Sequence, residues 1–251
     1  MLPILNRRKA EVLTALSKIN QEDHDKLKEL GAVDNKFWNT NDSDHAPLVA
    51  SFRSEVKRYY WERQSRMCCY CSKELDESKA AYDAEHIIPK NKFPEFMFEL
   101  ANLSVACKTC NGVKKNKSVL ATTLSQQEIP KLSSDYSIVH PHLDEWEAHF
   151  CFDAIRRITP LNGNEKGAKT IEVCGINYLN AARLSDYFLP ADYGAVQAAL
   201  EGFFRVKSRG WKLKYLNVLD GLVVDLSYEP ARKILEALRD EIQTDFSCAD
   251  S

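Results

Sequence analysis

The sequence has no long hydrophobic run. Hydrophobic residues make up 44% of its 251 residues, yet no segment approaches the roughly 18 apolar residues that a membrane-spanning helix needs. The apolar run at residues 1–5 is too short for a signal peptide, and Asn-Arg-Arg-Lys follows it at once. We therefore expect a soluble, cytoplasmic protein.

The chain also lacks an excess of charge of either sign. It contains 34 Lys and Arg against 36 Asp and Glu, so its formal net charge is -2. A protein that coats nucleic acid nonspecifically needs broad phosphate neutralisation by basic side chains. The charge balance argues against that class, so any contact with nucleic acid must use local basic patches.

Helical periodicity dominates the first 66 residues, and no repeat or low-complexity tract interrupts the chain. Amphipathic patterns predict helices over about 8–19 and 22–30, and Gly31 is expected to end the second. Pro47 fits the first turn of a third helix. The apolar residues of this third helix recur at helical spacing: Leu48, Phe52, Val56 and Tyr59.

The rest of the chain is less uniform. Between about 82 and 117 the helical period gives way to short strand-like and turn-like pieces, and segments 181–188, 192–206 and 229–246 again predict helices. We expect an α+β, mainly helical fold in one or two domains. Along the chain it would comprise an N-terminal helical region at 1–66, a core at 67–120 and a mainly helical C-terminal region at 121–251.

Four of the eight cysteines form two Cys-x-x-Cys pairs. In a chain without an export signal, such pairs favour metal binding over disulfides. Buried, reduced cysteines are the simpler alternative, but two pairs at this spacing favour a metal site. Four thiolates bind Zn²⁺ tetrahedrally and leave no open position, which is typical of a structural site. The predicted ligands are Cys68, Cys71, Cys107 and Cys110, with Cys69 outside the site.

Between the two pairs lies a segment rich in groups that carry chemistry. Residues 82–90 read Tyr-Asp-Ala-Glu-His-Ile-Ile-Pro-Lys, and on a strand Asp83 and Glu85 share one face while His86 points to the other. Asn102 follows in an Ala-Asn-Leu sequence, and Asn111 comes directly after the last cysteine. A lone histidine is more often structural, but this ordered set favours a catalytic one.

These motifs, in this order, resemble the HNH endonuclease family in its zinc-bound form. The matching elements are Cys-x-x-Cys, an acidic residue before His-Ile-x-Pro, Asn-Leu, and Cys-x-x-Cys-Asn-x-x-Lys, which together cover residues 68–117. The resemblance implies a ββα-metal core held by the four-cysteine zinc site. It also implies an enzyme that hydrolyses phosphodiester bonds of DNA, although RNA is not excluded as the substrate.

The resemblance assigns roles to individual residues. His86 corresponds to the general base, Asn102 to the residue that orients its ring, and Glu85 and Asn111 to ligands of the catalytic metal. Relatives commonly have Asp and His at the two ligand positions; the oxygen ligands found here suit Mg²⁺ or Mn²⁺ rather than zinc. Helix capping is a rival role for Asn111. Asp83 is either a further partner of the metal site or an acid on the strand surface.

Elementary chemistry agrees with these roles. Phosphodiester cleavage needs a deprotonated water and a cation that stabilises charge on the phosphate. A histidine with its ordinary pKa of about 6.5 can take that proton at neutral pH. Basic side chains near the histidine are expected to contact phosphates: Lys90, Lys114 and Lys115.

Two other motifs are weaker. Residues 205–214 place five basic side chains around Trp211, which fits either a nucleic-acid contact or, more simply, a solvated helix end. The His-Pro-His-Leu-Asp run at 140–144 lacks the geometry of a second metal site. With residues 162–163 and 170–177, however, it resembles nucleases of bacterial phage-defence systems of the Septu and retron-associated type, in which an ATPase partner controls the nuclease.

The sequence also leaves a second class of function open. The chain can be a zinc-stabilised module that binds nucleic acid or protein and does not cut. The presence of every catalytic position favours the enzyme, because a decayed site is expected to have lost at least one.

Overall fold

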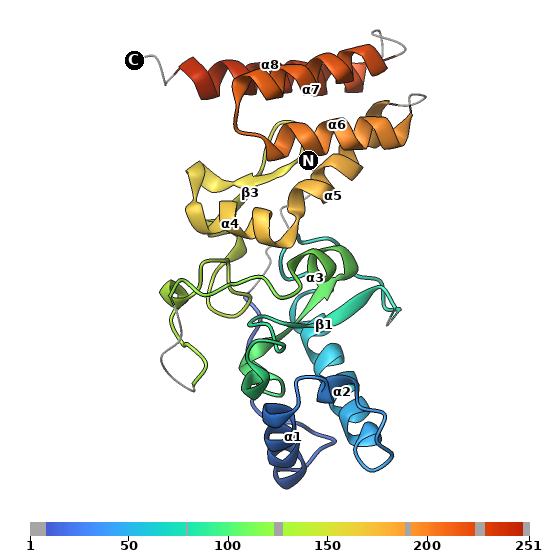
Figure 1. Ribbon diagram of the computed structural model, residues 1–251, viewed down its shortest axis with the longest axis vertical. Coiled ribbons are helices and arrows are strands. Elements are labelled where there is room, and N and C mark those ends of the chain that lie inside the picture. The colour runs from blue at the N-terminus through green and yellow to red at the C-terminus, as the bar shows by residue number, and fades with distance from the viewer. Residues whose placement is uncertain (1–8, 79, 123–127, 189–191, 224–228, 248–251) are drawn as a thin grey trace. The chain divides into compact units, whose positions relative to one another are not determined.

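The computed structural model describes residues 9–78, 80–122, 128–188, 192–223 and 229–247 (Figure 1). The fold is α+β and mainly helical, as expected, with two small two-stranded sheets. The chain forms two compact units, one of residues 1–150 and 160–175 and the other of residues 151–159 and 176–251. Within the described part of the chain, no helix is both long and apolar enough to cross a membrane.

Two of the three helices expected in the N-terminal region are confirmed. Helix α1 spans Gln21–Val33, and the side chain of Asn20 caps it by accepting a hydrogen bond from the amide of Asp23. Helix α2 spans Ala46–Arg63, with Pro47 in its first turn. One face of α2 is buried and forms much of the core of this unit: Val49, Phe52, Val56, Tyr60 and Trp61.

Gly31 does not end α1, contrary to the expectation from the sequence. The residue is buried inside the helix, and a Cβ atom built on it would lie 2.7 Å from the ring of Phe98. Phe98 is itself fully buried. Glycine is therefore needed here because α1 packs closely against Phe98, and not because the helix ends.

The helix expected over about 8–19 is wrong, because residues 9–20 form no helix. Ala10, Leu13 and Ile19 are buried, so the apolar pattern did report a contact with the core. Side chains of α2 bind the backbone of this segment: the Tyr60 hydroxyl accepts from the Leu13 amide, and the Glu55 carboxylate accepts from residues 17 and 18. These bonds replace those that a helix would have made.

The first compact unit contains a strand–strand–helix motif. Strand β1, Tyr82–His86, pairs antiparallel with β2, Leu103–Cys107, so that Tyr82 faces Cys107 and His86 faces Leu103. Helix α3, Lys108–Lys114, follows β2 directly. Every residue of β2 is buried. Gln64, at the end of α2, fixes this strand by hydrogen bonds to both the amide and the carbonyl of Val105.

Helix α4, Glu165–Cys174, was not expected from the sequence. Asn164 caps its start by accepting from the Gly167 amide. Gly175 ends it with a positive φ of 66°, the left-handed conformation that favours glycine. A Cβ on Gly175 would lie 2.6 Å from Val113, so the end of α4 packs closely on α3. The Asn and Gly signals were present in the sequence, and the helix between them is amphipathic, with Thr170, Ile171 and Cys174 among its buried residues.

The second unit contains a helical bundle. Its helices are α5, Ile176–Ser185; α6, Tyr193–Arg205; α7, Arg209–Leu222; and α8, Glu229–Ser247. The helices expected over about 181–188, 192–206 and 229–246 are thus confirmed. Helix α7 was not expected from the sequence. A short hairpin of β3, Phe150–Phe152, and β4, Ile158–Pro160, precedes the bundle. The buried core of this unit includes Leu200, Phe203, Leu216, Leu219 and Leu238.

Replacing Gly31 by alanine tests the close approach to Phe98. Alanine favours a helix over glycine by about 1 kcal/mol, but the added methyl group overpacks the Phe98 ring, which typically costs about 1–3 kcal/mol. We expect Gly31→Ala to lower the free energy of unfolding, measured by urea denaturation. Gly221→Ala in α7 is the matched control because a Cβ there meets no atom within 4 Å. An equal gain in stability for both variants would contradict the packing.

Candidate functional site

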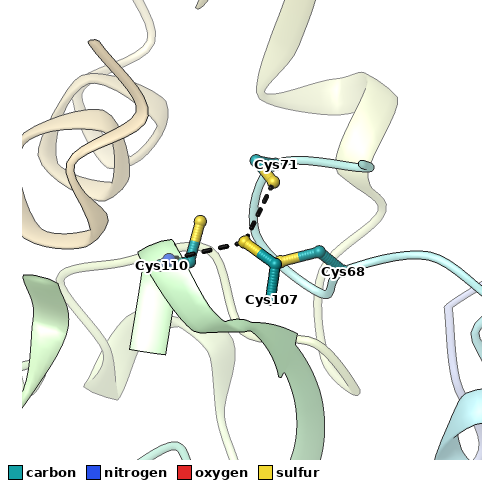
Figure 2. Close-up of side chains that lie close together, drawn as sticks. All are labelled: Cys68, Cys71, Cys107 and Cys110. Carbon is teal, nitrogen blue, oxygen red and sulfur yellow. Dashed lines mark hydrogen bonds between the residues drawn. The ribbon is translucent and has the colours of Figure 1, made fainter. Parts of the chain in front are cut away.

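The two Cys-x-x-Cys pairs meet in space (Figure 2). The sulfur atoms of Cys68, Cys71, Cys107 and Cys110 all lie within 4.8 Å of one another, and all four residues are buried. The Sγ atoms of Cys71 and Cys107 are 3.8 Å apart, well beyond the roughly 2.05 Å of a disulfide. The Sγ of Cys107 also accepts the amide of Cys110, which is how a helix start can orient a thiolate.

This geometry fits a tetrahedral metal such as zinc. Four sulfur atoms about 2.3 Å from a central ion have edges of about 3.8 Å, which matches the Cys71–Cys107 separation. The four cysteines can therefore bind such a metal, as expected from the sequence. Cys69 is buried but lies outside the cluster. Among the described residues, no other group of three or more His, Cys, Asp or Glu side chains comes together in this way.

Glu85 is held on the side of β1 that faces α3. Its side chain is buried, pairs with the Lys114 ammonium at 2.6 Å and accepts a hydrogen bond from the Tyr70 hydroxyl at 3.0 Å. Burial raises the pKa of this carboxyl group, although Lys114 and Tyr70 oppose the rise. Glu85, one of the two residues expected to bind the catalytic metal, is thus paired with a lysine in this structure.

Asp83 faces the same helix and binds Asn111. The Asn111 side-chain amide donates to the Asp83 carboxylate at 2.8 Å, and Lys108 forms an ion pair with the same carboxylate. The helix cap of α3 is Cys107, so helix capping, the rival role for Asn111, is ruled out. Asp83 therefore orients Asn111 through this hydrogen bond. Glu85 forms no hydrogen bond with either residue and binds Lys114 and Tyr70 instead.

His86 points away from α3, as strand alternation predicts. Its Nε2 lies 3.0 Å from the carbonyl oxygen of Met97, which can only accept, so Nε2 carries the proton and Nδ1 is the free acceptor. No buried side-chain nitrogen or oxygen of the described residues lacks a partner. Nδ1, for which no bond is found, therefore reaches the surface.

The surroundings of His86 lower its pKa to about 3, well below the value of about 6.5 expected from the sequence. Burial is the main cause, and the positive charges of Lys90, Lys114 and Arg53 add to it. The ring of Trp38 packs edge-on against the imidazole, with centroids 4.4 Å apart. At neutral pH the ring is therefore neutral, and in this environment it is a weak base.

Asn102 makes no side-chain hydrogen bond to the His86 ring, although it was expected to orient that ring. Its side chain instead bonds to the backbone on both sides of the loop: Oδ1 accepts from the Ile88 amide, and Nδ2 donates to the carbonyls of Ile88 and Phe96. It thus fixes the loop that carries Met97. The carbonyl of Met97 is the group that sequence reasoning missed, because no side-chain pattern marks a backbone acceptor.

The three lysines expected at phosphates differ in their exposure. Lys115 is exposed and Lys90 is partly exposed, so both can contact solution. Lys114 is buried, binds Glu85 and donates to the carbonyl of His86. The expectation for Lys114 is therefore wrong for this arrangement, because its charge is used inside the core. Arg53, which lies over the Trp38 ring, is a further cation near His86.

The His-Pro-His-Leu-Asp run is structural. The two ring nitrogens of His142 lie 3.0 and 2.7 Å from the carbonyl oxygens of Ala10 and Leu103, so this residue joins the N-terminal segment to the start of β2. Asp144 pairs with Lys166 of α4 at 2.6 Å. These bonds hold the run within the first unit.

Comparison with known proteins adds one finding. No protein-family model matches the chain. It is similar to the Septu protein PtuB of Bacillus thuringiensis, with 28% identity over 131 residues, a match that covers 50% of this chain and 42% of that protein. The similarity supports the looser of the two resemblances inferred from the sequence, to defence proteins of the Septu type.

Serine substitutions in the first cysteine pair test the metal cluster. Cys68→Ser should reduce the bound zinc, measured by mass spectrometry of the purified protein, and lower the unfolding midpoint by more than about 10 °C, since a structural metal site contributes folding free energy directly. Cys69→Ser is the matched control, because Cys69 is equally buried in the same turn. Equal metal loss in both variants would show that the cluster is assigned wrongly.

Substitution of Lys114 tests the buried ion pair. Lys114→Met leaves the Glu85 carboxylate buried without a cation, which we expect to cost about 3–5 kcal/mol of unfolding free energy. Lys115→Met, an exposed neighbour, should change it by no more than about 0.5 kcal/mol. The difference in unfolding free energy between the two variants should become smaller as the pH falls, because protonation removes the charge on Glu85. Urea denaturation at several pH values measures both effects.

Proposed function

We propose that this chain is a metal-dependent endonuclease of the HNH type that hydrolyses phosphodiester bonds of DNA. The observation that carries the proposal is the setting of His86. This histidine stands at the end of the first strand of the strand–strand–helix motif, with one nitrogen fixed by Met97 and the other open. The four-cysteine cluster lies next to the same motif, since Cys107 ends β2 and Cys110 belongs to α3.

In this mechanism the Nδ1 atom of His86 accepts a proton from the attacking water. The Met97 carbonyl holds the ring in the required tautomer, and Trp38 limits its rotation. A neutral ring with a low pKa is a weak base. A bound phosphate would counter the charges of Lys90 and Arg53 and so raise that pKa.

The oxygen ligands proposed for the divalent cation lie on the opposite face of β1 from the His86 ring, so the cation and His86 can act on one phosphate only after a rearrangement that brings these ligands to the His86 side. Carboxylate and amide oxygens suit Mg²⁺ or Mn²⁺, and such a cation supplies positive charge that stabilises the phosphate as it is attacked. Asp83 and Asn111 already lie together. Glu85 would complete the set by exchanging Lys114 for the cation.

That ion pair also favours a second candidate function. With Glu85 bound to Lys114, the site has no pair of free carboxylates, which fits a zinc-stabilised module that binds nucleic acid or protein without cutting. The two candidates differ in whether cleavage accompanies binding.

The similarity to a Septu protein supports a place for the chain in anti-phage defence. We propose that it acts there as the effector and that a regulatory ATPase partner controls its cleavage. The nearly neutral charge of the chain supports the need for a partner, because the protein has little long-range attraction for nucleic acid.

Cleavage assays with two histidine variants test the nuclease. We expect wild-type protein with Mg²⁺ or Mn²⁺ to cut plasmid DNA, single-stranded DNA or RNA, and His86→Gln to lose at least about 100-fold in rate. His24→Gln is the matched control: His24 is also buried and its Nε2 bonds to a neighbouring carbonyl, that of Phe98. It should keep its activity.

The substrate that is cut distinguishes a DNA nuclease from an RNA nuclease. Zinc content should be equal in all three proteins, so that loss of the fold is not mistaken for loss of chemistry. If metal-replete wild-type protein cuts none of the substrates, alone or with its ATPase partner, the binding module is the correct function.

A further inference from the structure

A cluster of exposed cations surrounds an exposed tryptophan where α6 ends and α7 begins. We call it the α6–α7 basic patch, and it belongs entirely to the second unit. Trp211 is 53% exposed, and each of the cations around it is exposed as well. Figure 1 shows α6 ending and α7 beginning at the same end of the bundle. The cations of the patch are Arg205, Lys207, Arg209 and Lys214.

None of these four cations forms an ion pair with a carboxylate of the described residues. Lys212, which lies among them in the sequence, is different: it turns into the bundle and binds Glu241 and Asp245 of α8. Glu241 also binds Arg157. Glu241 and Asp245 of α8 are thus engaged by Lys212 and Arg157 and not by the cations of the patch.

Helix stability does not explain the position of the charges. A cation in the last turn of a helix is favourable, which accounts for Arg205 in α6. Lys207 and Arg209 instead stand at the start of α7, where the helix dipole opposes positive charge. Ser208, at the cap position, makes no side-chain hydrogen bond there. This arrangement costs stability unless an anion is bound.

The aromatic group of the patch suits an unpaired base. The ammonium of Lys214 lies 4.3 Å from the centre of the Trp211 ring, and Tyr215 lies beside it with centroids 6.5 Å apart. An exposed aromatic ring flanked by cations can stack on a base while the cations bind neighbouring phosphates. Bases in a duplex keep their faces stacked on one another, so this contact selects a single strand.

We propose that the α6–α7 basic patch binds single-stranded nucleic acid, with a base stacked on Trp211 and phosphates bound by the surrounding cations. The exposed Trp211 ring with the Lys214 ammonium beside it favours a nucleic-acid strand over an acidic protein surface, because a strand offers an aromatic base next to each phosphate. The inference deepens the proposed nuclease function, on which it rests, by giving the strand an anchor on the second unit.

Binding of a fluorescein-labelled oligodeoxythymidine to the full-length protein tests the patch. Measurements by fluorescence anisotropy use the His86→Gln background, so that cleavage does not interfere. Trp211→Ala should weaken binding about tenfold, since stacking on one base contributes roughly 1–3 kcal/mol. Trp211→Phe should restore most of the affinity, because it keeps an aromatic face and controls for folding.

The charge contribution is measured from the dependence of affinity on salt. Replacing Lys207 and Arg209 by serine should reduce the slope of log K against log salt by about 1.4, that is, about 0.7 for each phosphate that the protein no longer neutralises. Replacing Arg232 and Lys233 of α8, which pair with glutamates of their own helix, removes the same charge and should leave the slope unchanged.

Three outcomes would overturn the inference: unchanged binding in both patch variants, an equal loss in the α8 control, or a duplex that binds as tightly as the single strand. The nuclease proposal fails separately. If the wild type cuts while the patch variants bind normally, only the patch is wrong; if nothing is cut but the patch variants lose binding, only the nuclease is wrong.

Discussion

The cluster of Cys68, Cys71, Cys107 and Cys110 is the constraint on which the middle of the molecule depends. It brings the turn before β1 to the junction of β2 and α3. A metal bound by the four thiolates would close a loop that contains Asp83, Glu85, His86 and Asn102, while Asn111 follows the last cysteine directly. Loop closure removes freedom from the unfolded chain. A strand pair this short would be marginal alone, and the cluster together with α2 explains how it can hold chemical groups in fixed positions.

Burial of charge sets the character of the two faces of β1. On one face, Glu85 and Lys114 neutralise each other inside the core, and the lysine also binds the backbone carbonyl of His86. On the other face, His86 stays neutral because its surroundings are both apolar and positive. One strand thus places an acid and a base back to back, and Lys114 links them, so a change at either face should be felt at the other.

Local signals in the sequence predicted local features well. The cysteine spacing predicted the cluster, and Pro47 marked the start of α2. What failed depends on contacts far along the chain: the segment at 9–20 is apolar because it lies on α2, and its backbone is satisfied there by Tyr60 and Glu55. The Met97 carbonyl and the partner of Lys114 could not be predicted either, because sequence periodicity carries no information on which backbone oxygen or buried acid a side chain will meet.

The chain does not visit its two compact units one after the other. Residues 151–159 belong to the second unit, and residues 160–175, with α4, return to the first before the bundle begins. A single recombination point after residue 175 would therefore exchange the whole bundle α5–α8 but leave residues 151–159 of its unit behind. An exchanged bundle would then have to fit the hairpin of the recipient, where the side chain of Asn180 in α5 bonds to both the amide and the carbonyl of Ile158.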